Sequence, residues 1–258
     1  PLKSNATEDG RWHNRRATIE AARIVPMTTL TGRITDQQTG KGLESTLLFF
    51  FFTRQDSLRT DTSGHYLVQL PKDSVIKIEA IARNYFFESV AMKMFGSPEL
   101  YQKYKLSPNI QLPPAKPGDK AVLRDLFFVG DQARLLKASE PELPKILRFM
   151  QLNNDLIIEI GGHVNVPYPS NHHFRLAPGQ TPADYAMKQE EAWKQGLSLS
   201  RAETVYRFLL QNGIDKSRMK TKGYQNSEML FPHASNAKQQ EQNRRVEIKV
   251  LGKVAAGG

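Results

Sequence analysis

The sequence predicts an α+β protein in which an antiparallel β-sandwich is followed by a second domain with helices packed on one sheet. Short apolar runs separated by turn residues fill residues 28–106, which is typical of a small sandwich. Four prolines and a glycine then interrupt residues 106–120, where neither a helix nor a central strand can continue. Beyond them, apolar residues recur at helical spacing between short strands. A chain of 258 residues suits two such domains better than one.

These changes along the chain predict four segments. Residues 1–27 are polar and basic without a clear period, so we expect a linker or arm there. The sandwich is expected at residues 28–106, a Pro-rich linker at residues 107–120, and the second domain at residues 121–252.

The composition narrows the class of partner. The chain has 36 Lys and Arg against 26 Asp and Glu, a net charge of +10, which favours nucleic acid, lipid headgroups or acidic cell-wall polymers. Only Arg15-Arg16 and Arg244-Arg245 are adjacent arginine pairs, so we expect no nucleic-acid binding. There is no cysteine, which excludes disulfides.

Membrane and targeting signals are weak. The longest apolar run, Leu47–Phe52, is far shorter than the roughly 20 residues of a membrane-spanning helix, so we expect no span in this chain. The first residues contain no apolar signal core. Either a signal has been removed or the chain is a piece of a longer protein.

The sandwich contains one unusual strand. Leu47–Phe52 is apolar on both faces, although a strand with one face in water should alternate. Two explanations are open: a loop of the same domain covers its outer face, or that face packs on the second domain or a partner. The other expected strands lie at residues 30–35, 65–70, 75–82 and 85–92.

The second domain alternates strands and helices. Ser200–Glu203 matches a capping box, which predicts that a helix starts there, after an insertion at residues 166–196 that is helical from Pro182. An earlier helix carries the stripe Leu143, Ile146, Leu147 and Met150. The expected strands are residues 121–129, 156–160, 220–224 and 245–250.

Two motifs in the sandwich resemble a known family. The segments G-R-I-T-D at residues 32–36 and D-T-S-G-H-Y at residues 61–66 are similar to carboxypeptidase-regulatory-like sandwiches. That resemblance implies a spacer or docking module and no enzyme.

A second resemblance covers the C-terminal half. Five segments occur in the order found in the OmpA C-terminal family, which includes the peptidoglycan-associated lipoprotein and MotB: residues 156–163, 197–202, 213–214, 222–224 and 243–248. The resemblance implies a βαβαβ two-layer domain whose cleft grips the diaminopimelate of the peptidoglycan stem peptide. It also implies a periplasmic protein associated with the cell wall and outer membrane.

The family pattern assigns the ligand's carboxylate to Arg201. A guanidinium offers a planar fork to a carboxylate, and the expected helix start would add unpaired N–H groups beside it. The family's Asp, which pairs with the ligand's amine, is replaced by Asn165. A neutral acceptor is expected to weaken binding about tenfold, unless another acid substitutes: Asp131, Asp184, Glu190 or Glu191.

Other expected site residues surround this pair. His163 and Val164 precede Asn165, Gly130 and Asp131 end the segment that enters the cleft, and Leu197 opens the motif of Arg201. Asn243 and Arg244 match the family's N-R-R motif, in which either a cleft role or a structural role remains open for Arg244.

No enzyme motif accompanies these residues. The chain contains no H-E-x-x-H, G-x-S-x-G or P-loop, and His163, His172 and His173 have no fixed metal-binding spacing. We therefore expect no cofactor, metal or catalysis, and a role in tethering an outer-membrane or secretion assembly to peptidoglycan. Two alternatives remain: a protein–protein scaffold with a vestigial cleft, and a metal-dependent wall amidase.

Overall fold

The computed structural model describes residues 3–15, 25–52, 54–95, 100, 108–129, 132–165 and 182–254, with side chains from residue 195 onward in the last range. The N-terminal arm is not entirely irregular, because α1 (Glu8–Asn14) is a short helix capped by Thr7, whose side chain accepts from the Gly10 N–H.

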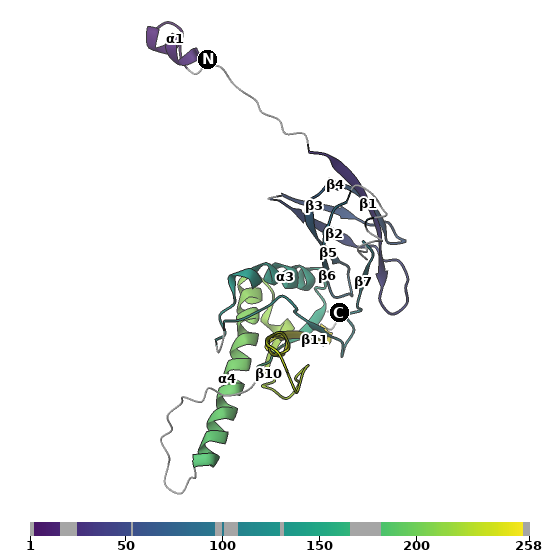
Figure 1. The fold of residues 1–258 in the computed structure, drawn as a ribbon, viewed down its shortest axis with the longest axis vertical. Helices are drawn as coiled ribbons and strands as arrows, with labels where there is room; N and C mark the ends of the chain where they lie inside the picture. The colour runs from purple at the N-terminus through teal and green to yellow at the C-terminus, as the bar shows by residue number, and fades with distance from the viewer. Residues whose placement is uncertain are drawn as a thin grey trace.

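The expected β-sandwich is present and consists of two sheets (Figure 1). Antiparallel pairing joins every neighbouring pair except β1 (Met27–Asp36) and β7 (Ile110–Leu112), which are parallel. One sheet has the order β4-β1-β7, with β1 (Met27–Asp36), β4 (His65–Pro71) and β7 (Ile110–Leu112). The other has the order β3-β2-β5-β6, with β2 (Thr46–Phe51), β3 (Arg54–Arg59), β5 (Val75–Ile81) and β6 (Glu88–Lys93).

The Pro-rich segment is more ordered than its composition predicts. Ile110 lies opposite Ile34 in the parallel pair of β7 and β1, and Pro114 forms a bridge with Tyr85. Proline excludes a central strand position but not an edge strand that ends before the next proline. The chain therefore continues in the sandwich after residue 106.

The second domain has one mixed sheet of the order β10-β9-β11-β8. β9 (Leu156–Gly162) and β10 (Met219–Gly223) are parallel and joined through α4 (Pro182–Gln211), whereas β11 (Val246–Lys253) is antiparallel to β9 and to β8 (Lys120–Val122). The remaining helices are η1 (Lys137–Glu142), α3 (Leu143–Leu152), η2 (Lys216–Arg218) and α5 (Ala237–Asn243).

The core of this domain lies between the sheet and helices α3 and α4 (Figure 1). Apolar residues of both helices and of the inward face of the sheet are fully buried, which confirms the predicted α+β architecture. They include Ile146, Phe149, Ala202, Val205, Leu209, Ile158, Ile160, Ile248 and Val250.

Two expected elements were wrong. The strand predicted over residues 121–129 ends at Val122, and only an isolated bridge joins Phe128 to Leu135. No helix starts at Ser200, because α4 runs without a break from Pro182 to Gln211. The capping-box letters therefore lie inside a helix, where backbone N–H groups already have partners.

The outer face of the sheet that contains β2 meets the second domain through its neighbouring strand β5. Leu48 is buried on the face opposite the sandwich core, and its partner on β5 is Glu79. The Glu79 carboxylate forms ion pairs with Arg148 and Lys145 of α3. Of the two explanations for the apolar tract, packing on the second domain is therefore the one that the structure supports.

A phenylalanine joins the two domains. Phe86, between β5 and β6, is 1% exposed and belongs to the core of the second domain. Its ring stacks on Phe149 of α3, with centroids 5.4 Å apart. Next to it, the Asn84 N–H donates to Asn153 Oδ1 at 2.6 Å. The loop between β5 and β6 thus places a phenylalanine of the sandwich in the core of the second domain.

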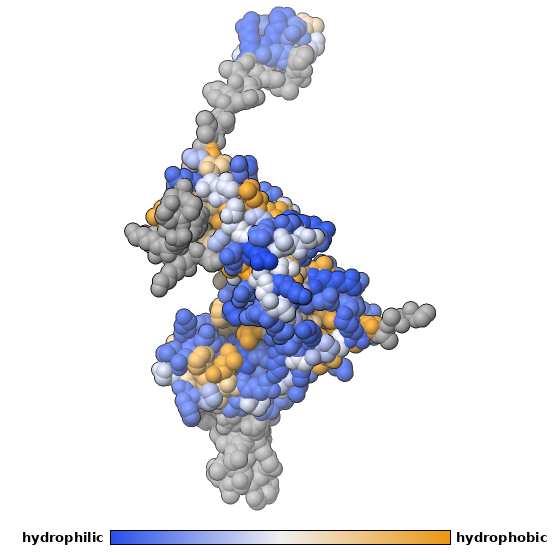
Figure 2. Space-filling model, turned by 90° about the vertical axis from the view of Figure 1, so that its right-hand side faces the viewer, coloured by the Kyte–Doolittle hydropathy of each residue, from blue (hydrophilic) through white to orange (hydrophobic). Residues whose placement is uncertain are grey.

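The visible surface is mostly hydrophilic, with small apolar patches (Figure 2). Among the helices in the described ranges, none combines the length and hydrophobicity of a membrane span.

Candidate functional site

The candidate site lies where β9 ends. The backbone N–H of His163 donates to the Arg245 carbonyl at 2.9 Å, and that of Val164 donates to the Gln225 carbonyl at 2.9 Å. The strand-end loop is therefore fixed between β11 and the segment that follows β10.

Two glycines allow α4 to pack closely on this edge. A Cβ on Gly162 would lie 1.9 Å from the Ser198 carbonyl oxygen, and one on Gly223 would lie 2.6 Å from Ser198 Oγ. Only glycine accepts such a close approach of a helix. This contact places the next turn of α4, with Arg201, beside the loop.

Arg201 is buried, whereas the family pattern implied a guanidinium that is accessible to the ligand's carboxylate. Its side chain is 1% exposed. Nη1 donates to the His163 carbonyl at 3.1 Å, Nε donates to the Gln132 carbonyl at 3.3 Å, and the guanidinium lies 5.2 Å from the Phe128 ring centroid. Because Arg201 lies in the middle of α4, no unpaired helix-start N–H groups accompany it.

His163 is buried beside an aromatic ring and a carboxylate. Its ring stacks on Tyr224 with centroids 4.9 Å apart, and Nε2 lies 3.5 Å from the Glu247 carboxylate. Burial raises the pKa of Glu247, but His163 and the charge of Arg245 outweigh it and lower that pKa to about 2. Glu247 is therefore an anion at neutral pH, paired with Arg245 and close to the His163 ring.

Asn165 and Asn243 form a clamp. Asn243 is fully buried, and its Nδ2 donates to Asn165 Oδ1 and to the Phe231 carbonyl, both at 2.8 Å. Its Oδ1 accepts from the Phe231 N–H at 2.9 Å. Asn243 therefore holds two loops together, which is a structural role.

The remaining expected residues are dispersed. Leu197 is half-buried in α4, and Arg244 is half-buried in a separate hollow beside α5. Gly130 and Asp131, His172 and His173, and the side chains of Asp184, Glu190 and Glu191 lie outside the described residues.

Three site residues were missed from the sequence. Gln132 contributes a carbonyl, which no side-chain motif reveals. Tyr224 lies over Gly161, where a Cβ would approach its ring to 2.7 Å, and donates to Glu159 Oε1 at 2.6 Å. Glu247 had a signal, because it is a charged residue between the apolar Val246 and Ile248 in a buried strand.

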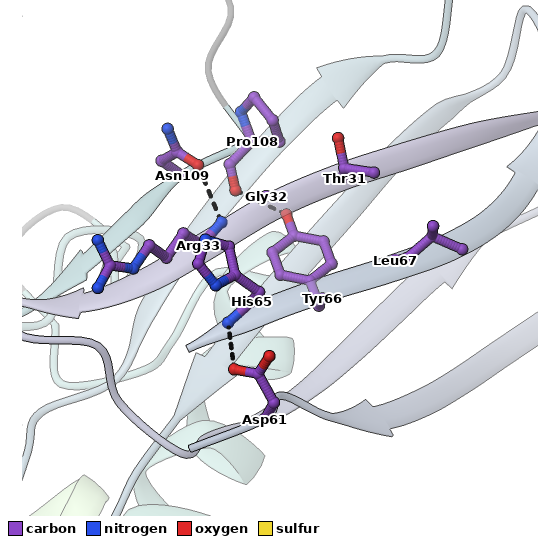
Figure 3. Close-up of a pocket in the computed structure, with 9 residues that line it drawn as sticks. All are labelled: Thr31, Gly32, Arg33, Asp61, His65, Tyr66, Leu67, Pro108 and Asn109. Atoms are coloured by element: carbon purple, nitrogen blue, oxygen red, sulfur yellow. Dashed lines mark hydrogen bonds between the residues drawn. The ribbon is translucent and has the colours of Figure 1, made fainter. Parts of the chain in front are cut away.

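Another hollow, of about 710 Å³, lies on the sandwich beside β1 and β4 (Figure 3). Its polar groups hold the turn at Asp61 and join β4 to the segment before β7. Asp61 accepts from the His65 N–H at 2.9 Å, and the Tyr66 hydroxyl donates to the Pro108 carbonyl at 2.6 Å. Gly64 has φ +83° and a Cβ there would meet the Ile34 carbonyl oxygen, which explains the D-T-S-G-H-Y segment as turn chemistry.

Part of the chain matches a known protein family. Residues 127–244 match the model of the OmpA family. The periplasmic domain of MotB from Helicobacter pylori is 17% identical, with a TM-score of 0.39, over 53% of this chain and 82% of that one. The cell wall anchor of the T6SS from Pseudomonas aeruginosa is 21% identical, with a TM-score of 0.36, over 52% of this chain and 79% of that one.

One curated protein is also similar. The photosystem I P700 chlorophyll a apoprotein A2 of Gloeobacter violaceus is 26% identical over 135 residues, which make up 50% of this chain. The match spans only 13% of that protein's length.

Proposed function

Because residues 127–244 form an OmpA family domain, we propose that the chain binds peptidoglycan without catalysis and anchors an envelope assembly to the cell wall. The observation that carries the proposal is the family domain with Arg201 held at the end of β9 by the His163 carbonyl. The proposed location is the periplasm, in contact with the wall and the outer membrane.

The proposed ligand is the diaminopimelate of the stem peptide. Its amino-acid end carries an ammonium and a carboxylate, which suit the oxygen of Asn165 and the guanidinium of Arg201. Arg201 is 1% exposed, and its Nε donates to the Gln132 carbonyl. A carboxylate that binds the guanidinium must therefore displace this contact. The 3.3 Å bond to the Gln132 carbonyl is the contact that the ligand would replace.

Burial of Arg201 favours a second candidate function, a protein–protein scaffold with a vestigial cleft. In that case the Asn at position 165 and the covered guanidinium would both reflect lost wall binding. The two functions differ in whether the protein recognises isolated wall material.

Co-sedimentation with purified sacculi tests the proposal. We expect the protein to pellet with sacculi and to return to the supernatant when a diaminopimelate-containing tripeptide competes, because both ligands use the same groups. No soluble wall fragments should be released. Protein that remains in the supernatant without competitor would support the scaffold, and fragment release that a chelator abolishes would support the amidase.

Asn165→Asp is expected to strengthen binding of the tripeptide about tenfold, because a charge-assisted bond to an ammonium replaces a neutral one. An aspartate still accepts from Asn243, so the clamp is retained. Titration calorimetry measures the change, with Asn212→Asp, an exposed position at the end of α4, as the control for added charge. Complete loss of binding in Asn165→Asp would contradict the placement of the ligand's amine.

A further inference from the structure

The end of the sandwich at which the N-terminal arm enters carries exposed apolar side chains. Val25, Met27 and Phe52 are 39%, 50% and 76% exposed. β2 ends beside the start of β5, whereas Phe86, which joins the second domain, follows the end of that strand. The end with Val25, Met27 and Phe52, called the sandwich tip, therefore points away from the second domain (Figure 1).

Phe52 occupies a turn position that disfavours its side chain. Phe51 pairs with Arg54, so only two residues connect β2 and β3, and Phe52 is the first of them. Turns of this length in hairpins need a positive φ at that position, which is why Asn, Asp and Gly are preferred there. Phe52 has φ +51° and buries little of its ring. Because both the backbone conformation and the exposure are unfavourable for Phe, the side chain is expected to contact another molecule.

A hollow of about 700 Å³ lies beside Phe52. Residues of both sheets line it, because it lies at the ends of β2 and β4 and at the starts of β1 and β3. Its apolar lining consists of Val25, Pro26, Met27, Phe51, Phe52 and Pro71. This volume and this lining suit a hydrocarbon group.

The charged lining of the hollow is mainly basic. It consists of Arg54, Lys72 and Asp56, all of which are exposed. Neither cation forms an ion pair with a residue in the described part of the chain. The arm that enters here is also basic, with Lys3, Arg11, Arg15, Arg16 and Arg23 against Glu8, Asp9 and Glu20.

This arrangement is complementary to a phospholipid surface, in which anionic phosphates border hydrocarbon. Long basic side chains can keep their charge among headgroups while neighbouring apolar residues enter the hydrocarbon boundary. Lysine is depleted in protein–protein interfaces, so a free Lys72 next to Met27 and Phe52 favours lipid over a protein partner.

We propose that the sandwich tip inserts into a phospholipid surface with anionic headgroups. Phe52 and Met27 enter the hydrocarbon boundary, and Arg54 and Lys72 contact phosphates. This inference goes beyond the proposed function, because it uses no residue of the OmpA family domain. It places the lipid contact and that domain at opposite ends of the sandwich.

Flotation with lipid vesicles over a series of lipid concentrations tests the proposal. We expect the full chain to float with vesicles of equal parts phosphatidylglycerol and phosphatidylcholine, and to stay behind with phosphatidylcholine alone. Phe52→Asn removes the apolar group and suits the positive φ, so it should weaken binding about tenfold without lowering the midpoint of thermal unfolding. Leu210→Asn, which replaces a 42% exposed leucine of α4, is the matched control and should bind like the wild type.

The charge of the tip is tested separately. Arg54→Gln should weaken binding to the mixed vesicles about fivefold, because one cation near the anionic surface is lost. Arg207→Gln, on the exposed side of α4, removes the same charge elsewhere and should have no such effect.

The net charge of +10 can by itself attract the chain to anionic vesicles. Phe52→Asn leaves that charge unchanged, so equal binding of the wild type and Phe52→Asn would overturn the proposal. Absence of flotation with both kinds of vesicle, or equal binding to both, would also overturn it. If the chain does not float but self-associates in sedimentation velocity, and Phe52→Asn abolishes that association, the tip joins copies of the chain instead.

Discussion

Alanine in place of Phe86 is expected to lower the free energy of unfolding by about 3–5 kcal/mol. The side chain is 1% exposed and stacks on Phe149 inside the core of the second domain, so its removal leaves a cavity that the two domains share. Urea denaturation followed by circular dichroism gives the midpoint and the free energy. The size of the loss measures how much the contact of Phe86 with the second domain stabilises the protein.

The matched control is Phe52→Ala. Phe52 is 76% exposed at the end of β2, so its replacement should change the free energy of unfolding by no more than about 0.5 kcal/mol. An equally small effect at Phe86 would mean that the junction is open in solution and that the sandwich is only a tethered spacer.

Arg201→Gln is expected to weaken binding of the diaminopimelate tripeptide roughly 100-fold. Removal of one partner from a hydrogen-bonded charge pair costs about 3 kcal/mol, and each tenfold step in affinity corresponds to about 1.4 kcal/mol. Glutamine can still donate to one carbonyl, so the loop should stay folded. Calorimetry on the folded variant measures the loss.

Controls separate loss of the ligand from loss of the fold. Arg207→Gln removes a cation from the same helix and should bind normally. Thermal unfolding of Arg201→Gln shows whether its structure persists. A folded Arg201→Gln protein with unchanged affinity would mean that the guanidinium has a structural role and does not bind the ligand.

The order of elements could be predicted because the apolar pattern changes period along the chain. β11 alternates strictly with Val246, Ile248 and Val250 inward, and the stripe that includes Ile146 and Met150 marks α3. The start of α4 at Pro182 was predicted, but the capping-box letters at Ser200 wrongly indicated a second start, because the same letters can lie inside a continuous helix that is stabilised by packing. Tertiary contacts also gave the Pro-rich segment its strand β7, whose partner is distant in sequence.

The sequence motifs identified residues of the site but not the groups that surround them in the fold. Motif order identified Arg201, but its burial depends on the Gln132 carbonyl and the Phe128 ring, which belong to a distant segment. Likewise, the N-R-R motif could not distinguish the clamp made by Asn243 from the pocket reached by Arg244. Such roles depend on contacts between segments that are distant in sequence, and the spacing of residues in a motif does not reveal these contacts.

A crystal structure of the protein with the bound tripeptide tests the role of Arg201 most directly. We expect the guanidinium to have left the Gln132 carbonyl and to hold a diaminopimelate carboxylate through two bonds of about 2.8 Å. A ligand bound elsewhere, with Arg201 still covered by Gln132 and His163, would contradict wall binding through this residue.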